Sequence, residues 1–151
     1  MLTAEALADL VSKYNPKSNS AKIVEAYKYG QIKHEGQFRK SGEPYFTHPV
    51  SVAEILAEQR LDDATIITAL LHDTIEDTGS TKQDISNRFS HEISELVDGV
   101  TKLTKIQLSS METQEAENIR KLLMAIAQDI RVILVKLADS CLLYTSDAAD
   151  D

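Results

Sequence analysis

The stretch that decides the fold is residues 61–80, with the sequence LDDATIITALLHDTIEDTGS. It predicts one helix, because Asp62 or Asp63 can cap its N-terminus and Gly79 suits a left-handed residue after its end. At about 100° per residue, apolar and polar side chains separate onto opposite faces of this helix. The apolar face holds Ile66, Ile67, Leu70, Leu71 and Ile75, and the polar face holds His72, Asp73, Glu76 and Asp77.

The polar face of this helix combines one imidazole with three carboxylates and contains no lysine or arginine. A solvated helix surface typically carries cations spaced four residues from its carboxylates. Crowded carboxylates beside a histidine are costly unless a cation sits among them. The face therefore indicates a metal site. A solvated acidic cluster is the alternative that this stretch alone leaves open, since charged residues are mostly exposed.

Composition limits the class of protein. The chain has 151 residues, 42% apolar and 26% charged, which is typical of one soluble globular domain with a real core. Its net charge of −8 argues against nonspecific nucleic-acid binding but allows a local basic pocket for a phosphorylated small molecule. A single cysteine, Cys141, excludes an internal disulfide and suits a reducing compartment. Without a secretory signal or a membrane-length apolar run, we expect a cytoplasmic protein that binds no membrane.

Scarce strand-like alternation, with only three prolines and five glycines, predicts an all-α domain. We expect helices over about 3–14, 21–33, from 47 or 48 onward, 81–89, 90–103, 112–128 and 130–139, and a mobile loop over 104–112. Ser18 or Ser20 is expected to cap the second helix, and Pro49 to occupy the first position of the third. Ile32 is predicted to be buried. The last helix is apolar almost all round, so it is expected at the centre of the core.

Residues 37–49, QFRKSGEPYFTHP, form a predicted loop, because Gly42 and Pro44 break helices. It carries Arg39, Lys40 and Ser41, and loops on a rigid scaffold are where binding groups gather. A guanidinium and an ammonium group suit a phosphate or a base plane, although a solvated turn is the alternative. His48 follows at a helix start and becomes a candidate metal ligand because the helix with His72 needs partners.

Four segments together resemble a known family: HEGQFRKSGEPYFTHPVSVAEILAE from His34, LDDATIITALLHDTIEDT, LVDGVTKLTKI and QEAENIRKLLMAIAQDIRVILVKLAD. They are similar to the N-terminal HD hydrolase domain of the Rel/SpoT-type guanosine tetra-/pentaphosphate synthetase/hydrolases. The resemblance covers nearly everything from about Ala4 to Asp139. It implies an all-α HD-type phosphohydrolase that removes the 3′-pyrophosphate of (p)ppGpp, giving GDP or GTP plus pyrophosphate, in stringent-response control.

The resemblance also implies roles for individual residues. The metal ligands would be His48, His72, Asp73 and Asp139, around one manganese ion; chemistry alone indicates only a borderline divalent metal. Glu76 and Asp77 would position or deprotonate the attacking water. Arg39, Lys40 and Ser41 would hold the guanine nucleotide, with Tyr45 lining the same pocket. Hydrolysis of another purine nucleotide and a non-catalytic nucleotide-binding fragment are the competing interpretations.

The sequence departs from the family after Asp139. The family continues Arg-Leu-His-Asn-Met-Arg-Thr, whereas residues 140–146 here are SCLLYTS. The family asparagine falls on Leu143, so a polar contact to the 3′ side of the substrate is expected to be lost. We therefore expect an HD hydrolase domain over residues 1–139, truncated at its C-terminal side, followed by a non-native or aberrant tail over residues 140–151.

Overall fold

The computed structural model describes residues 1–109, 117, 119–120, 123–124 and 129–145. Within these residues the regular structure is helical, apart from an isolated bridge between Phe38 and Pro44, so the all-α prediction is confirmed. No helix among them combines the length and the apolar character needed to cross a membrane. The helices are α1 (Ala4–Tyr14), α2 (Ser20–Lys33), α3 (Thr47–Glu58), α4 (Asp63–Leu71), α5 (Thr74–Thr78), α6 (Lys82–Arg88), α7 (His91–Ser109) and α9 (Ile130–Thr145).

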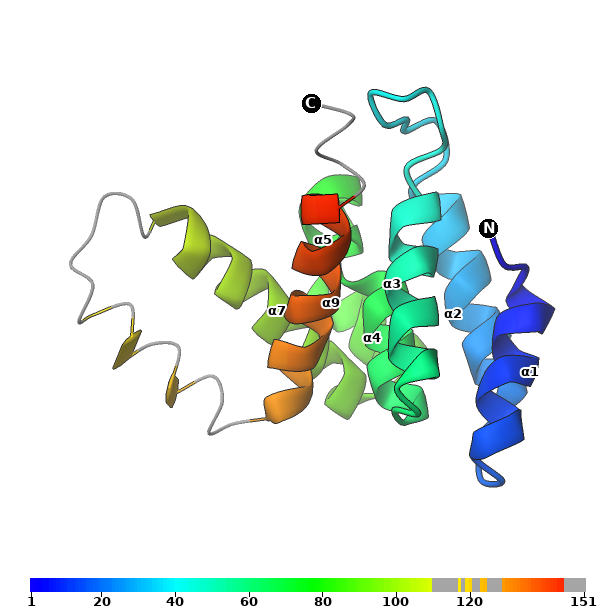
Figure 1. Cartoon of the computed structure of the whole chain (residues 1–151). Coiled ribbons are helices and arrows are strands. Elements are labelled where there is room, and N and C mark those ends of the chain that lie inside the picture. Colours follow the sequence, from blue (N-terminus) through cyan, green and yellow to red (C-terminus); the bar gives the residue numbers. More distant parts are fainter. Residues whose placement is uncertain (110–116, 118, 121–122, 125–128, 146–151) are drawn as a thin grey trace.

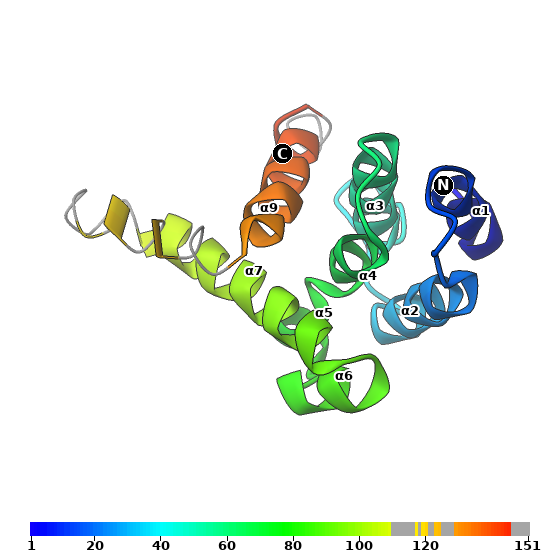
Figure 2. The ribbon, with the colours of Figure 1, turned by 90° about the horizontal axis from the view of Figure 1, so that it is seen from below.

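Helix α4, from the stretch that decides the fold, lies at the centre of the molecule (Figures 1 and 2). It contacts α2, α3, α7 and α9, and every residue from Thr65 to Leu71 is buried. Asp62 caps its N-terminus by accepting from the backbone N–H of Thr65, as the sequence predicts. The C-terminal end of α4 is therefore held rigidly against the helices around it.

The single helix predicted over 62–78 is wrong, because α4 ends at Leu71 and α5 begins at Thr74. At this break two side chains form hydrogen bonds with backbone carbonyl groups of α4. His72 Nδ1 lies 2.7 Å from the Ala69 oxygen, and Thr74 Oγ1 donates to the Leu71 oxygen over 2.8 Å. Such local side-chain bonds compete with the helical ladder. The break places His72 and Asp73 between two helices rather than on one continuous face.

Two glycines allow the close helix packing that places the later site residues. A Cβ atom at Gly30 of α2 would lie 2.6 Å from Phe46 Cε1 and 2.9 Å from the carbonyl oxygen of Leu70. A Cβ atom at Gly99 of α7 would lie 2.9 Å from Val132 Cγ2 of α9. Contacts this short are not tolerated, so glycine at these positions fixes how near α2 and α9 come to their neighbours.

Several local predictions in the first half of the chain need correction. Asn19 caps α2, while the Ser18 hydroxyl instead donates to Asp63 Oδ1 over 2.8 Å. Ile32 is 67% exposed, because it lies nine residues after the buried Ile23 and hence about 180° round the helix. Helix α3 begins at Thr47, which makes Pro49 its third residue rather than its first.

The second half also differs from expectation. Helix α7 continues to Ser109 through the predicted loop, since no glycine or proline interrupts residues 100–109 after position 99. Most of the helix predicted over 112–128 lies outside the described residues. Helix α9 continues to Thr145, across the expected boundary at residue 139. Among the described residues it packs against α3, α4 and α7, and its Leu137 is 61% exposed there, so the expectation of a wholly central helix is wrong.

Candidate active site

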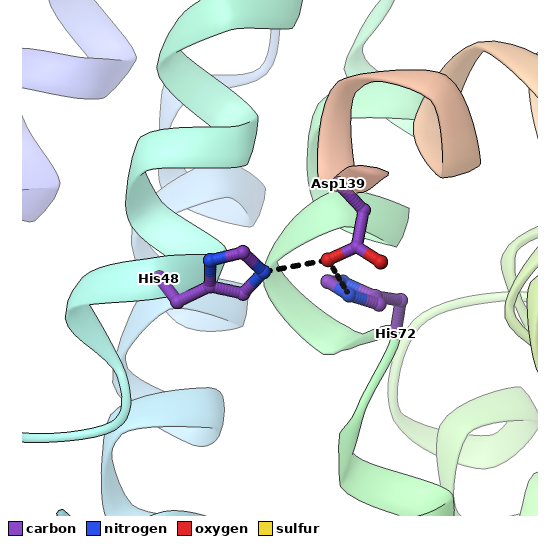
Figure 3. Close-up of side chains that lie close together, drawn as sticks. All are labelled: His48, His72 and Asp139. Atoms are coloured by element: carbon purple, nitrogen blue, oxygen red, sulfur yellow. Dashed lines mark hydrogen bonds and ion pairs between the residues drawn. The ribbon is translucent and has the colours of Figure 1, made fainter. Parts of the chain in front are cut away.

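Three side chains, from α3, from the break after α4 and from α9, converge on one point (Figure 3). His48 comes from the first turn of α3, His72 follows the last residue of α4, and Asp139 lies on α9. One ligand atom from each lies within 4.8 Å of the other two, and all three residues are buried. Asp139 Oδ1 is 2.6 Å from His48 Nε2 and 3.4 Å from His72 Nε2. Two imidazole nitrogens and a carboxylate oxygen at this spacing are suitable donors for a divalent metal ion.

The environment of His72 fits a metal ligand. Its Nδ1 donates to the Ala69 carbonyl, because a carbonyl oxygen can only accept. Its Nε2 is buried and makes no hydrogen bond to any described residue. A buried polar atom without a partner is costly, and a metal ion at this point would satisfy it.

The cluster also favours positive charge at this point. Burial alone would lower the pKa of His72, yet the charges of Asp73 and Asp139 raise it to about 9 in the metal-free protein. Burial would likewise raise the pKa of Asp139, but the hydrogen bond from His48, the nearby His72 ring and the charge of Lys136 hold it well below its usual range. Asp139 therefore stays a carboxylate, ready to bind a cation.

Asp73 lies beside the cluster without belonging to the group of three. Its Oδ2 is 3.3 Å from His72 Nε2. The same oxygen accepts a 2.6 Å hydrogen bond from the Tyr45 hydroxyl. The structure thus brings His48, His72 and Asp139 together and places Asp73, the fourth predicted ligand, at the edge of the same centre.

Glu76 and Asp77 are exposed on α5, one helical turn beyond Asp73. Partial burial and the neighbouring charges of Asp73 and Glu76 raise the pKa of Asp77. The crowding of carboxylates in this stretch predicts such a rise. A carboxylate with a raised pKa is a better proton acceptor at neutral pH than an ordinary surface aspartate.

The loop between α2 and α3 is compact and lies at the same end of the molecule as α5 (Figure 1). Its turn is closed by the N–H of Arg39 donating to the Glu43 oxygen over 2.8 Å and the N–H of Gly42 donating to the Arg39 oxygen over 2.9 Å. Gly42 has a φ of 91°, a left-handed conformation that suits glycine. The loop therefore holds Arg39, Lys40 and Ser41 in a defined turn.

An open pocket of about 440 Å³ lies between this loop and His48, one of the predicted metal ligands. It is lined by Met1, Arg39, Ser41, Glu43, Thr47, His48, Ser51 and Leu142. Two of the three predicted loop residues therefore share a pocket with His48. Lys40 is exposed and is not part of this lining.

Tyr45 takes a different position from the expected one. Its hydroxyl faces Asp73, and its ring lies 5.0 Å from the ring of His34 and 6.3 Å from that of His48, measured between centroids. It is not part of the pocket lining. Tyr45 thus contacts Asp73, next to the cluster of His48, His72 and Asp139.

Sequence reasoning missed two residues that support the site. Gln37 Nε2 donates to the Asp77 carbonyl over 3.0 Å, which ties the loop to α5. Lys136 Nζ donates to Asp139 Oδ2 over 3.0 Å. Lys136 stands three residues before Asp139 in an otherwise apolar run, and that position is the signal that could have identified it.

Residues 26–143, most of the chain, match the family model of the HD domain. The chain belongs to the HD-domain family. The resemblance inferred from the four segments is confirmed.

Relatives of this HD domain come from the Rel/SpoT proteins. The chain is 52% identical over 139 residues to the GTP pyrophosphokinase rsh of Brucella melitensis, covering 92% of this chain and 18% of that protein. It is 50% identical over 139 residues to the bifunctional (p)ppGpp synthase/hydrolase SpoT of Escherichia coli K12, covering 92% of this chain and 20% of that protein. The chain therefore spans about a fifth of the length of these relatives.

A solved structure supports the same relationship. It is described as a metazoan ortholog of SpoT that hydrolyzes ppGpp, and it is 31% identical to this chain with a TM-score of 0.62. The match covers 82% of this HD domain and 68% of the solved chain.

Proposed function

We propose that this HD domain removes the 3′-pyrophosphate of (p)ppGpp in a metal-dependent hydrolysis, as part of stringent-response control in the cytoplasm. The observation that carries the proposal is the convergence of His48, His72 and Asp139 beside a pocket lined by Arg39 and Ser41. Support comes from relatives that include an Escherichia coli O157:H7 protein named guanosine-3′,5′-bis(diphosphate) 3′-pyrophosphohydrolase, 50% identical over 139 residues.

His48, His72, Asp139 and the adjacent Asp73 would hold one manganese ion. When bound, such an ion lowers the pKa of a coordinated water and neutralises phosphate charge. The unpartnered His72 Nε2 and the anionic Asp139 are the features that suit this role.

Side chains of this chain would bind the substrate and move the proton. The guanidinium of Arg39 and the hydroxyl of Ser41 would bind the guanine nucleotide in the pocket, with Lys40 adding positive charge at its rim. Glu76 and Asp77 would orient the attacking water and accept its proton. The water oxygen forms a bond to the phosphorus that is attached to the ribose 3′ oxygen. The bond between this phosphorus and the ribose oxygen breaks, which releases pyrophosphate, and the ribose oxygen takes up the proton that the carboxylate accepted from the water.

The test is release of pyrophosphate from guanosine tetraphosphate by the purified chain, with Mn²⁺ and with EDTA. We expect Mn²⁺-dependent release. Glu76→Gln should bind Mn²⁺ as tightly as the wild type yet lose about 100-fold in turnover, because general-base groups contribute roughly that much. Glu58→Gln, at the exposed end of α3, is the matched control and should be fully active. Unchanged turnover in the Glu76 variant would reject its role.

One observation favours a second candidate, a domain that binds nucleotide without turning it over. Leu142 lines the pocket at the position where the resembled family has histidine. An apolar side chain there provides no hydrogen bond to a phosphate. Equilibrium binding of guanosine tetraphosphate without pyrophosphate release would support this candidate. Assays with dNTPs and adenosine analogues test whether another purine nucleotide is the substrate instead.

A further inference from the structure

Lys136 is a buried lysine whose ammonium group contacts the metal centre. The residue is only 8% exposed, and Nζ donates to Asp139 Oδ2 over 3.0 Å. Lysine is rarely buried unless it is paired, because removing its charge from water is costly. The spacing of three residues on α9 puts Lys136 and Asp139 on the same helical face.

The two oxygens of Asp139 have different partners. Oδ1 faces His48 Nε2 at 2.6 Å and His72 Nε2 at 3.4 Å, whereas Oδ2 is bonded to Lys136. The terminal torsion of an aspartate rotates over a broad range unless its oxygens are held. We propose that Lys136 is a positioning residue of the metal centre: it holds Oδ2, fixes the plane of the carboxylate and leaves Oδ1 as the oxygen that binds the ion.

This inference rests on the metal site of the proposed function. Lys136 has two opposing effects on metal binding, charge repulsion and positioning of the ligand. An ammonium group near a cation repels it, so removing Lys136 would tighten metal binding if charge alone mattered. A ligand that is held in orientation binds more tightly than a freely rotating one, so removing Lys136 would weaken binding if positioning mattered more. Because Lys136 bonds the oxygen turned away from the two histidines, positioning is the larger effect.

The experiment measures Mn²⁺ affinity of the metal-free chain by isothermal titration calorimetry. Lys136→Met keeps an unbranched side chain, one atom shorter, and removes the donor and the charge. We expect Mn²⁺ to bind about 10–100-fold more weakly, the usual loss when an outer partner of a metal ligand is removed. Lys136→Arg, which keeps a charged donor, should recover most of the affinity.

Lys102→Met is the matched control. Lys102 Nζ lies 2.9 Å from Asp98 Oδ2 on α7, so it forms a similar helical ion pair, but its side chain is 71% exposed. Its loss should leave Mn²⁺ affinity unchanged. Co²⁺ absorption gives a second readout, and Lys136→Met should alter the spectrum because the orientation of Asp139 changes.

The outcomes separate this inference from the proposed function. A wild-type chain that binds no Mn²⁺ would overturn both. A wild-type chain that binds Mn²⁺, together with a folded Lys136→Met variant that binds it equally or more tightly, would overturn the inference alone. If Lys136→Met does not fold, Lys136→Gln takes its place, since glutamine keeps a donor without the charge. The inference then requires that Lys136→Gln bind Mn²⁺ more weakly than the wild type, by up to about 10-fold. Binding as tight as that of the wild type, or tighter, would overturn it.

Discussion

Replacing Asp139 by asparagine tests whether one carboxylate completes the centre. Asparagine keeps the shape of the side chain but removes the negative charge that faces His48, His72 and Lys136 at 2.6, 3.4 and 3.0 Å. Removing one partner of a buried ion pair typically costs about 3–5 kcal/mol. His72, whose raised pKa depends on the charges of Asp73 and Asp139, can relieve part of this imbalance by losing a proton. We therefore expect the lower end, a loss of about 3 kcal/mol in the free energy of unfolding.

The assay is urea unfolding at pH 7 in EDTA, compared with unfolding in excess Mn²⁺. Ligand at about 100 times its Kd stabilises a protein by about 2.7 kcal/mol, so the wild type should gain stability from Mn²⁺ and Asp139→Asn should gain none. Asp98→Asn is the control, because Asp98 pairs with Lys102 on a more exposed helix face and should lose less than about 1 kcal/mol. Equal losses in the two variants, or stabilisation of Asp139→Asn by Mn²⁺, would refute the reasoning.

Three further predictions concern other parts of the site and its support. The pKa of His72 is raised from 6.5 to about 9, so its contribution to metal-free stability is complete below pH 6.5 and is lost as pH rises through about 9. The urea midpoint in EDTA should fall across that range, and a flat profile would contradict the charge balance described. Tyr45→Phe removes the hydroxyl bonded to Asp73 and should weaken Mn²⁺ binding about 10-fold by calorimetry, whereas Tyr27→Phe, whose hydroxyl bonds the Leu2 carbonyl, should not. Gly30→Ala should lower the free energy of unfolding by about 1–2 kcal/mol, because overpacking against a backbone oxygen outweighs the roughly 1 kcal/mol by which alanine favours a helix. A urea midpoint at or above that of the wild type would show that α2 can move away.

Helical periodicity predicted most of the elements, since apolar spacing depends on burial of one face and that face persists in the structure. It could not show the break after Leu71. The hydrogen bonds of His72 and Thr74 to helix carbonyls leave the apolar spacing almost unchanged, so the sequence pattern continues through the break. The sequence pattern also could not predict the exposure of Leu137, because that exposure depends on which helices pack around α9.

Some residues of the candidate site could likewise be predicted from the sequence, and others could not. His72 and its acidic neighbours form a local pattern that indicates a cation by itself. His48 and Asp139 are separated by 91 residues, and no local pattern connects them; only the resemblance to a family did so. Lys136 and Gln37 escaped notice because their roles depend on which atoms they face in the folded chain, and residue type alone does not determine that.

The distance along the chain between His48 and Asp139 has a consequence for biosynthesis. A ribosome delivers the carboxylate 91 residues after the first imidazole, so a nascent chain cannot chelate an ion at this centre until α9 has emerged and docked. Capture of the ion would then be among the last events of maturation. In a cell short of the proposed ion, newly made molecules would lack it before older ones lose it.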